Sequence, residues 1–374
     1  MFDRPVGNDA AVLVSLDFGD AEYQDSLEEL HHLARSAGLR VKAVVEGRRP
    51  KPDAALFIGS GKAEELRASL LGNDSKLAIF NHDLSPSQQR NLEKLLECRV
   101  LDRTGLILDI FAQRAKSHEG KLQVELAQLE HLATRLIRGW THLERQKGGI
   151  GVRGGPGETQ LELDRRQIRQ RVKLLKEKLQ KLKSQRGQQR SFRRRSGVLS
   201  VSLVGYTNAG KSTLFNRLTQ SGVYAANQLF ATLDTTSRKL YIPDCGQIVL
   251  SDTVGFIRNL PHTLVESFGA TLEEAAQADL LLHVVDVASE VREQQIIEVD
   301  RVLKEIGAQD VPQVLVLNKI DNAGMEPGLE RDEYGKISKV WVSAQHGSGL
   351  EFIRQALAER HQKIEVNSPE LVVG

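Results

Sequence analysis

Apolar and polar positions alternate in two different rhythms along the first 118 residues. Short apolar runs, typical of strands in a largely parallel sheet, are separated by longer amphipathic stretches with helical spacing. The predicted strands are residues 11–16, 41–45, 54–58, 77–80 and 99–101, and the predicted helices are residues 23–37, 63–71 and 86–97. This rhythm predicts a small N-terminal α/β domain over residues 1–118.

A short glycine-containing motif, GSGK, occupies residues 59–62 of this domain. It is too short for a phosphate-binding P-loop, and neither serine nor threonine follows Lys62. We therefore interpret it as a strand-to-helix turn.

Residues 119–190 have a third rhythm, in which apolar residues recur at helical, heptad-like spacings. One series consists of Leu122, Leu126, Leu129, Ala133, Leu136, Trp140 and Leu143, and the other of Leu161, Ile168, Val172, Leu175, Leu179 and Leu182. Between them lie six glycines in the ten residues 148–157, which no helix would tolerate. The pattern predicts an antiparallel helical hairpin with a glycine-rich tip.

The chain from residue 184 to about 196 is polar and basic without periodicity, and we assign residues 191–197 as a basic linker. Residues 198–366 return to apolar strands alternating with helices, and residues 367–374 form a tail. This second α/β domain is expected to contain a mostly parallel sheet flanked by helices.

The composition is that of a soluble globular protein, with 40% hydrophobic and 27% charged residues over 374 positions. Its two cysteines exclude a disulfide framework and a four-cysteine zinc site. The N-terminus lacks the pattern of a signal peptide, and no apolar run is long enough to span a membrane. We expect a cytoplasmic protein.

The net charge of +2 conceals a strong asymmetry. Residues 165–195 contain fourteen lysines and arginines against one acid, so they carry +13 while the rest of the chain carries −11. An anionic partner is expected for this stretch.

Candidate chemistry begins with GYTNAGKS at residues 205–212, which fits the P-loop pattern GxxxxGK[ST]. An apolar strand at 198–204 precedes it and a helix is predicted after it, as a P-loop requires. Backbone N–H groups would surround the β-phosphate, Lys211 would reach the β- and γ-oxygens, and the Ser212 hydroxyl would bind Mg²⁺.

Two further motifs indicate that the nucleotide is GTP. DTVG at residues 252–255 fits DxxG, with Asp252 reaching Mg²⁺ through water and the Gly255 amide sensing the γ-phosphate. NKID at residues 318–321 places a carboxylate, Asp321, where it can accept from guanine N1–H and N2. The backbone of Ser343 and Ala344 would complete the base pocket.

The threonine that closes over the γ-phosphate is less sharply specified, and Thr232 in the segment 230–234 is our prediction, with Thr235 and Thr236 as rivals. The full set of expected nucleotide contacts is Gly205, Tyr206, Thr207, Asn208, Ala209, Gly210, Lys211, Ser212, Thr213, Phe230, Ala231, Thr232, Leu233, Asp234, Asp252, Thr253, Val254, Gly255, Asn318, Lys319, Ile320, Asp321, Ser343, Ala344 and Gln345. Ser212 and Thr232 are the direct Mg²⁺ ligands of this set, and Lys211, Thr232 and Gly255 its catalytic members.

Two positions bear on the hydrolysis mechanism. Phe256 stands where Ras-like enzymes carry the glutamine that positions water, so water must be held by backbone, another residue or a partner. Asn208 occupies the P-loop position at which potassium-activated GTPases coordinate K⁺, and we hypothesise the same here.

Three further stretches are not found in GTPases generally: GGIGVRGGPGETQLE at 148–162, DRTGLILDIF at 102–111 and KLQVELAQL at 121–129. Together with the P-loop, DTVGFI at 252–257 and NKID, they resemble the HflX family of GTPases over nearly the whole chain. The resemblance implies a GTPase of the Obg–HflX group that binds the large ribosomal subunit and splits or rescues idle or stalled ribosomes under stress.

The sequence departs from the family in two places. Gly154 and Gly155 make the signature one glycine longer than its shorter form, and the chain ends at Gly374 without the further C-terminal domain of some members.

The hairpin itself favours an RNA partner. Each arm of about twenty-five residues would be roughly 35–40 Å long. Its basic returning helix can meet phosphates, and its glycines allow close backbone approach. The candidate contacts are Arg145, Lys147, Gly151, Arg153, Gly154, Gly155 and Gly157. The alternative is a solvated charged face with a flexible turn.

The sequence thus predicts a monomeric GTP-driven switch, slow in hydrolysis until a ribosome stimulates it. Two rival functions remain open. One is a GTP-gated RNA-modifying factor, which would need a second active site. The other is a scaffold that dimerises through a coiled coil and retains GTP as a structural ligand.

Overall fold

The computed structural model describes residues 10–138, 160–195, 198–222, 228–243, 246–258, 260, 264 and 269–366. The chain divides into two compact units, Met1–Leu179 and Gln180–Gly374. Within the described residues, no helix combines the length and apolarity needed to cross a membrane.

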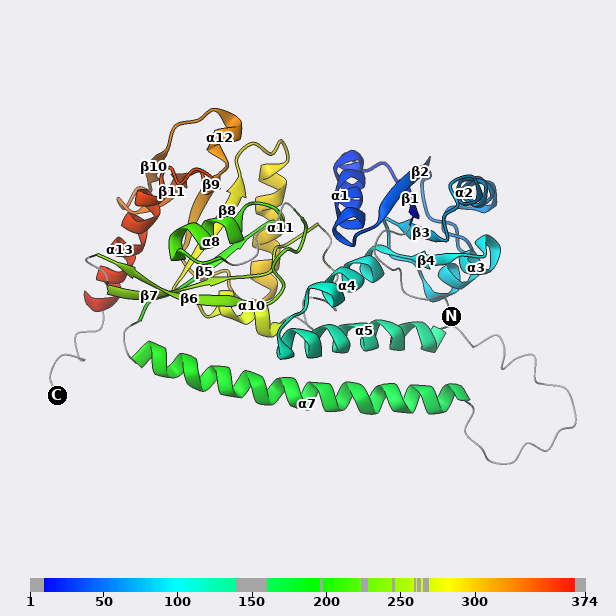
Figure 1. The fold of residues 1–374 in the computed structure, drawn as a ribbon, viewed down its shortest axis with the longest axis horizontal. Helices are drawn as coiled ribbons and strands as arrows, with labels where there is room; N and C mark the ends of the chain where they lie inside the picture. Colours follow the sequence, from blue (N-terminus) through cyan, green and yellow to red (C-terminus); the bar gives the residue numbers. More distant parts are fainter. Residues whose placement is uncertain are drawn as a thin grey trace, which may run out of the picture. The chain divides into compact units, whose positions relative to one another are not determined.

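The first unit contains a four-stranded sheet in which every strand pair is parallel, with the order β2-β1-β3-β4 (Figure 1). Its strands are β1 (Ala10–Asp17), β2 (Arg40–Arg48), β3 (Leu77–Phe80) and β4 (Arg99–Leu101), and its helices are α1 (Tyr23–Ser36), α2 (Ser60–Gly72), α3 (Pro86–Leu96) and α4 (Arg103–Arg114). Val12 and Val14 of β1 pack with apolar residues of α2 and α3. The intervening Leu13 is also fully buried, so both faces of the sheet are covered.

The predicted strand at residues 54–58 is wrong. These residues form a tight turn in which Asp53 and Phe57 exchange backbone hydrogen bonds of 2.8 and 3.1 Å. The Asp53 carboxylate accepts from the amides of Ala55 and Leu56, each at 2.8 Å, which stabilises the turn against an extended strand. Gly59, with φ +80°, then leads into α2, so the GSGK motif begins a helix without a strand before it.

Helix α4 was not predicted from the sequence. It begins where the Asp102 carboxylate accepts from the Gly105 amide at 2.8 Å, which is an N-cap of the ordinary kind. The DRTG segment that resembles the HflX family is therefore, in part, a helix start.

Two long helices, α5 (His118–Arg138) and α7 (Gln160–Arg195), run in opposite directions (Figure 1). Ion pairs join them, Arg171 to Glu125 at 2.6 Å and Lys176 to Glu130 at 2.8 Å. Leu122, Leu126 and Leu175 are buried, as the predicted seams require. The helical hairpin is confirmed, whereas its glycine-rich tip and all seven candidate RNA contacts lie outside the described residues.

The predicted basic linker is wrong over residues 191–195, because α7 continues to Arg195. Lysine, arginine and glutamine are good helix formers, so this stretch is helical without an apolar period. The linker's last residues, 196 and 197, and the tail 367–374 lie outside the described residues.

The second unit contains a seven-stranded sheet with the order β10-β11-β9-β8-β5-β7-β6. Its strands are β5 (Ser200–Gly205), β6 (Thr236–Ile242), β7 (Gly246–Asp252), β8 (Leu280–Asp286), β9 (Gln313–Asn318), β10 (Gly328–Arg331) and β11 (Ile337–Trp341), and its further helices are α8 (Lys211–Thr219), α10 (Gly269–Ala276), α11 (Arg292–Glu305), α12 (Ile320–Ala323) and α13 (Leu350–Val366). The central pairs are parallel, and the edge strands β6 and β10 pair antiparallel. The expected mostly parallel sheet flanked by helices is confirmed.

Helices α8 and α13 contribute apolar side chains to one core with strands β5, β8 and β9. Because β5, β7, β8 and β9 are parallel, their carboxyl ends lie at one edge of the sheet. The P-loop follows β5, DTVG lies at the end of β7 and NKID lies at the end of β9, so the fold brings these three motifs together.

Candidate nucleotide-binding site

The P-loop connects β5 to α8 through backbone conformations that few side chains tolerate. Gly205 has φ +145°, and a Cβ there would lie 2.2 Å from the Val284 carbonyl oxygen. Gly210 has φ +95°, and a Cβ there would lie 2.2 Å from Asn318 Nδ2. Both glycines of the motif are therefore required by close backbone packing as well as by conformation.

Lys211 begins α8 and is 6% exposed. Its Nζ donates to the carbonyl oxygens of Gly205 at 3.1 Å and Tyr206 at 2.8 Å. Burial lowers the Lys211 pKa to about 8, and the nearby Asp252 carboxylate partly opposes that shift. A buried ammonium group at the N-terminus of a helix is well placed to bind phosphate oxygens.

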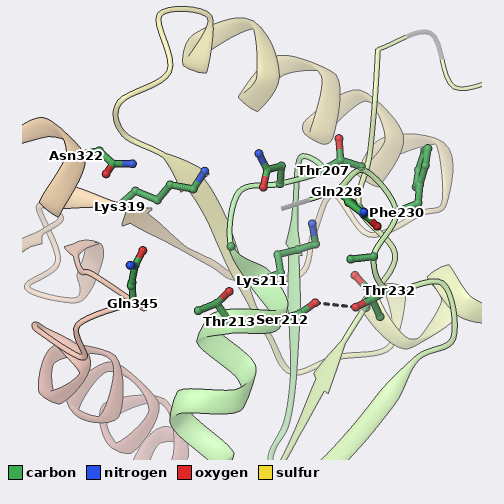
Figure 2. Close-up of a pocket in the computed structure, with 15 residues that line it drawn as sticks. Thr207, Lys211, Ser212, Thr213, Gln228, Phe230, Thr232, Lys319, Asn322 and Gln345 are labelled. Atoms are coloured by element: carbon green, nitrogen blue, oxygen red, sulfur yellow. Dashed lines mark hydrogen bonds between the residues drawn. The ribbon is translucent and has the colours of Figure 1, made fainter. Parts of the chain in front are cut away.

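Three oxygen-bearing side chains converge beside Lys211. Ser212 Oγ lies 2.7 Å from Thr232 Oγ1 (Figure 2). Ser212 Oγ donates to Asp252 Oδ2 at 2.6 Å, and Thr232 Oγ1 donates to the same oxygen at 3.1 Å. Thr236 begins strand β6 instead. Neither Thr235 nor Thr236 is among the residues that line the cavity described below, so the geometry favours Thr232 over both.

The Asp252 carboxylate has chemistry that fits a cation. It is fully buried, and its Oδ1 has no hydrogen-bond partner among the described residues. Burial raises the Asp252 pKa, while the hydrogen bond from Ser212 opposes the shift. A buried carboxylate with an unsatisfied oxygen, next to two hydroxyls, is a donor set that Mg²⁺ and its water ligands satisfy.

Gly255 lies against the P-loop, whereas the side chain of the next residue, Phe256, is buried in the protein core. A Cβ on Gly255 would lie 2.8 Å from Thr207 Cγ2 and 2.9 Å from Lys211 Nζ, so this backbone lies directly against the P-loop. The Phe256 side chain is fully buried in the protein. Its amide donates to Gly205 and its carbonyl accepts from Thr207, at 3.2 and 2.7 Å. Phe256 thus fixes the DxxG segment to the P-loop and offers no polar atom for a water molecule.

The NKID motif joins the two halves of the site. Asn318 Nδ2 donates to the Ala209 carbonyl at 2.8 Å, and Asn318 Oδ1 accepts from the Ala344 amide at 2.9 Å. Lys319 pairs with Asp286 at 2.7 Å. Ser343 Oγ donates to Asp321 Oδ1 at 2.5 Å. The other carboxylate oxygen, Asp321 Oδ2, lies 4.0 Å from His346 Nε2.

Residues of these segments line an open cavity of about 320 Å³. Figure 2 shows Lys319, Asn322 and Gln345 on one side and Lys211, Ser212 and Thr232 on the other. The predicted residues that line it are Thr207, Asn208, Gly210, Lys211, Ser212, Thr213, Phe230, Ala231, Thr232, Thr253, Gly255, Lys319 and Gln345.

The cavity also contains two residues that the motifs did not include, Gln228 and Asn322. Asn322 directly follows Asp321 and Gln228 precedes Thr232 by four residues, so proximity in sequence was their available signal.

The remaining predicted contacts lie outside the cavity lining: Gly205, Tyr206, Ala209, Leu233, Asp234, Asp252, Val254, Asn318, Ile320, Asp321, Ser343 and Ala344. Ala209, Leu233, Val254 and Ile320 are buried. Asp252 contacts the lining directly, because it accepts hydrogen bonds from Ser212 and Thr232. Asn318 and Ser343 instead hold the backbone of Ala209 and Ala344 and the Asp321 carboxylate behind the lining.

A P-loop, a serine–threonine pair on a buried aspartate, and an NKxD motif on one cavity define the class of P-loop GTPases, enzymes that bind and hydrolyse GTP. Family models match three consecutive segments of the chain. They are described as "GTP-binding GTPase N-terminal" for residues 24–112, "GTP-binding GTPase Middle Region" for 114–193 and "50S ribosome-binding GTPase" for 200–319.

Two curated relatives identify the family. GTPase HflX of Escherichia coli strain K12 is 56% identical over 362 residues, which are 96% of this chain and 84% of the relative. GTPase HflX of Magnetococcus marinus is 50% identical over 350 residues, 92% of this chain and 81% of the relative. The chain belongs to the HflX family of GTPases.

A solved structure shares the fold. The crystal structure of the SsGBP–GDP complex matches with a TM-score of 0.51 and 25% identity, covering 96% of this chain and 99% of that one.

Proposed function

We propose that this GTPase is a switch that associates with the large ribosomal subunit in the cytoplasm, and that it splits or rescues idle or stalled ribosomes under stress. The model matched by residues 200–319 is described as a 50S ribosome-binding GTPase, which supports this partner. The main support from the chain itself is α7, a 36-residue helix with exposed lysines and arginines along most of its described length. Such a surface suits the phosphates of rRNA.

The GTPase site would act as follows. Lys211 and the P-loop amides bind the phosphates, while Asp321 and the loop at Ser343 and Gln345 bind guanine. Mg²⁺, which P-loop GTPases use with GTP and GDP, would be held by Ser212 and Thr232 directly and by Asp252 through water, and would supply charge to the phosphates. Thr232 and Gly255 hold their segments in the GTP state and release them after hydrolysis.

Hydrolysis by the isolated protein should be slow, because Phe256 replaces the water-positioning glutamine. We propose that K⁺ coordinated by Asn208 and contacts with the ribosome supply the missing stabilisation. Asn208 supports the first part, because it lines the cavity in a left-handed conformation with φ +62°.

The test is GTP hydrolysis in KCl, with and without purified large ribosomal subunits, for the whole protein and for a variant lacking residues 148–157. We expect strong stimulation of the whole protein and its loss in the deletion variant. A Gly222→Ala variant is the matched control, because an added Cβ there has no atom within 4 Å. A hydrolysis rate that large subunits leave unchanged would reject the ribosomal partner while leaving the GTPase assignment intact.

The rival functions make different predictions. A coiled-coil scaffold would sediment as a dimer that survives high salt, whereas phosphate contacts weaken steeply as salt rises. A GTP-gated RNA-modifying factor would change the covalent structure of its RNA, which mass analysis of RNA recovered after turnover would detect.

A further inference from the structure

The loop that follows β11 forms the base side of the cavity and is tied to NKID from one direction. Ser343 Oγ donates to Asp321 Oδ1 and accepts from the His346 amide at 3.1 Å. The Ala344 amide donates to Asn318. These bonds hold the amide side of the loop, whereas its carbonyl groups at 344 and 345 need separate donors.

Arg217 supplies those donors from a different element. It lies in the last turn of α8, the helix that Lys211 begins. Its Nε donates to the Ala344 carbonyl at 3.2 Å, and one of its terminal nitrogens donates to the Gln345 carbonyl. A guanidinium presents its N–H groups in a rigid fork, which suits two successive carbonyls in a way that a lysine ammonium does not.

We propose that Arg217 is a positioning residue for guanine recognition, because its guanidinium holds the 344–345 segment against the P-loop helix. The residue itself is six positions, or about 9 Å along the helix, beyond Lys211, so it acts through the loop. With both carbonyls of the 344–345 segment held, the N–H groups of this segment are fixed relative to the phosphate-binding end of α8. Gln345, which lines the cavity, then presents its backbone to the base in one orientation.

The consequence is selective for one part of the base. Guanine O6 accepts hydrogen bonds from N–H groups, and a 6-amino group at the same place would oppose them. The 2-amino group is recognised by Asp321, whose hydrogen bond from Ser343 does not involve the Ala344 and Gln345 carbonyls that Arg217 holds. Loosening the loop therefore weakens discrimination at position 6 of the purine and preserves discrimination at position 2.

Arg217 is suited to a clean test because its side chain is exposed, so truncation leaves no cavity in the core. We expect Arg217→Ala to weaken GDP and GTP binding about tenfold, through faster dissociation, as loss of a charge-assisted bidentate contact would. At saturating GTP, kcat should stay within about twofold, because the phosphate groups are untouched. Arg217→Lys should show an intermediate loss of affinity.

The decisive readout compares three nucleotides. The affinity ratio of GTP to 2,6-diaminopurine riboside triphosphate should narrow in Arg217→Ala, and the ratio of GTP to ITP should stay unchanged. Arg301→Ala is the matched control, since Arg301 is an exposed arginine of the same unit that pairs with Glu298 on α11. Unaltered GTP affinity in Arg217→Ala, or equal narrowing of both ratios, overturns the proposal. Because wild-type GTP binding is measured alongside, failure of the GTP site itself would be seen separately.

Discussion

Gly205 sets the position of the P-loop through the absence of a side chain. Its φ of +145° is rare for other residues, and a Cβ would overlap the backbone oxygen of Val284 on the neighbouring strand. We expect Gly205→Ala to lower the free energy of unfolding by about 3 kcal/mol or more and to abolish nucleotide binding. Gly222→Ala, with open space around the new Cβ, should be near neutral in the same urea titration. Equal stabilities of the two variants would contradict the argument.

Asn208 makes a prediction about the salt rather than the fold. If its side chain coordinates K⁺ beside the phosphates, the added positive charge stabilises the transition state for phosphoryl transfer. GTP hydrolysis should then be faster in KCl than in NaCl at equal ionic strength, and Asn208→Ala should remove the difference. Equal rates for the wild type in the two salts would eliminate the K⁺ hypothesis.

His283 gives the GTPase unit a pH-dependent stability. It lies within β8, is 2% exposed, and its Nε2 has no hydrogen-bond partner in the described parts of the chain. Burial lowers its pKa to about 4, a hydrogen bond with Gln313 opposes the shift, and the charge of Lys211 adds to it. In the unfolded chain this histidine binds its proton near pH 6.5, whereas in the folded protein it stays neutral until about pH 4. The contribution of His283 to the free energy of unfolding is therefore fully present above pH 6.5 and is lost as the pH falls toward 4.

The loss at this histidine should reach about 2 kcal/mol by pH 5. The measurement is urea unfolding at pH 7.5 and pH 5.0, followed by Trp341 fluorescence in a Trp140→Phe background, for the wild type and His283→Gln. The glutamine variant should lose less stability on acidification. Matching losses in both proteins would show that another group controls the acid response.

The sequence predicted most residues of the site because the motifs combine residue type with spacing. Lys211, Ser212 and Gly255 belong to motifs whose residue types suit phosphate binding, so spacing alone places them in the candidate site. Gln228 and Asn322 line the same cavity but belong to no motif, so their nearness in sequence to Thr232 and Asp321 was the only signal for them. Arg217 was missed for the same reason, since its two carbonyl partners are more than a hundred residues away in sequence.

At the scale of elements, apolar runs predicted strands well where neighbouring strands could pair with them. Residues 77–80 and 99–101 form β3 and β4 with the predicted bounds. Residues 54–58 have a similar composition but fold into a turn, because the Asp53 carboxylate satisfies two local amides. The length of helix α7 was underestimated because its last two turns lack an apolar period. These turns nevertheless contain good helix formers, so the helix continues through them.

Gly187 is the weak point within α7. It lies inside the helix, and an added Cβ would have no atom within 4 Å. We expect Gly187→Ala to stabilise the surrounding helical turns by about 0.5–1 kcal/mol, because alanine loses less backbone entropy than glycine. Amide hydrogen exchange around residue 187 should slow about two- to fivefold. Gln188→Ala, which exchanges two good helix formers, is the control, and equal exchange rates in both variants would refute the effect.

At the scale of the whole molecule, the positive charge is concentrated in residues 165–195, which contain none of the nucleotide motifs. The +13 of residues 165–195 lies in a single helix, while the remaining chain carries −11. Arg171 and Lys176 are paired with acids of α5, so their charge is partly offset within the protein. Other exposed cations of α7, such as Arg169 and Lys173, face solvent and have the charge density expected of a phosphate-binding surface.

The last prediction concerns how this surface of α7 binds the large ribosomal subunit as the salt concentration changes. Each phosphate contact releases about one counterion, so removing two contacts lowers the slope of log K against log salt by about 2. We expect this change for a variant carrying Arg169→Gln and Lys173→Gln, together with weaker binding at every salt concentration. A variant carrying Arg301→Gln and Lys304→Gln removes the same charge from α11 and should bind like the wild type. If both variants lose the same affinity and slope, net charge governs the association, and α7 has no special part in it.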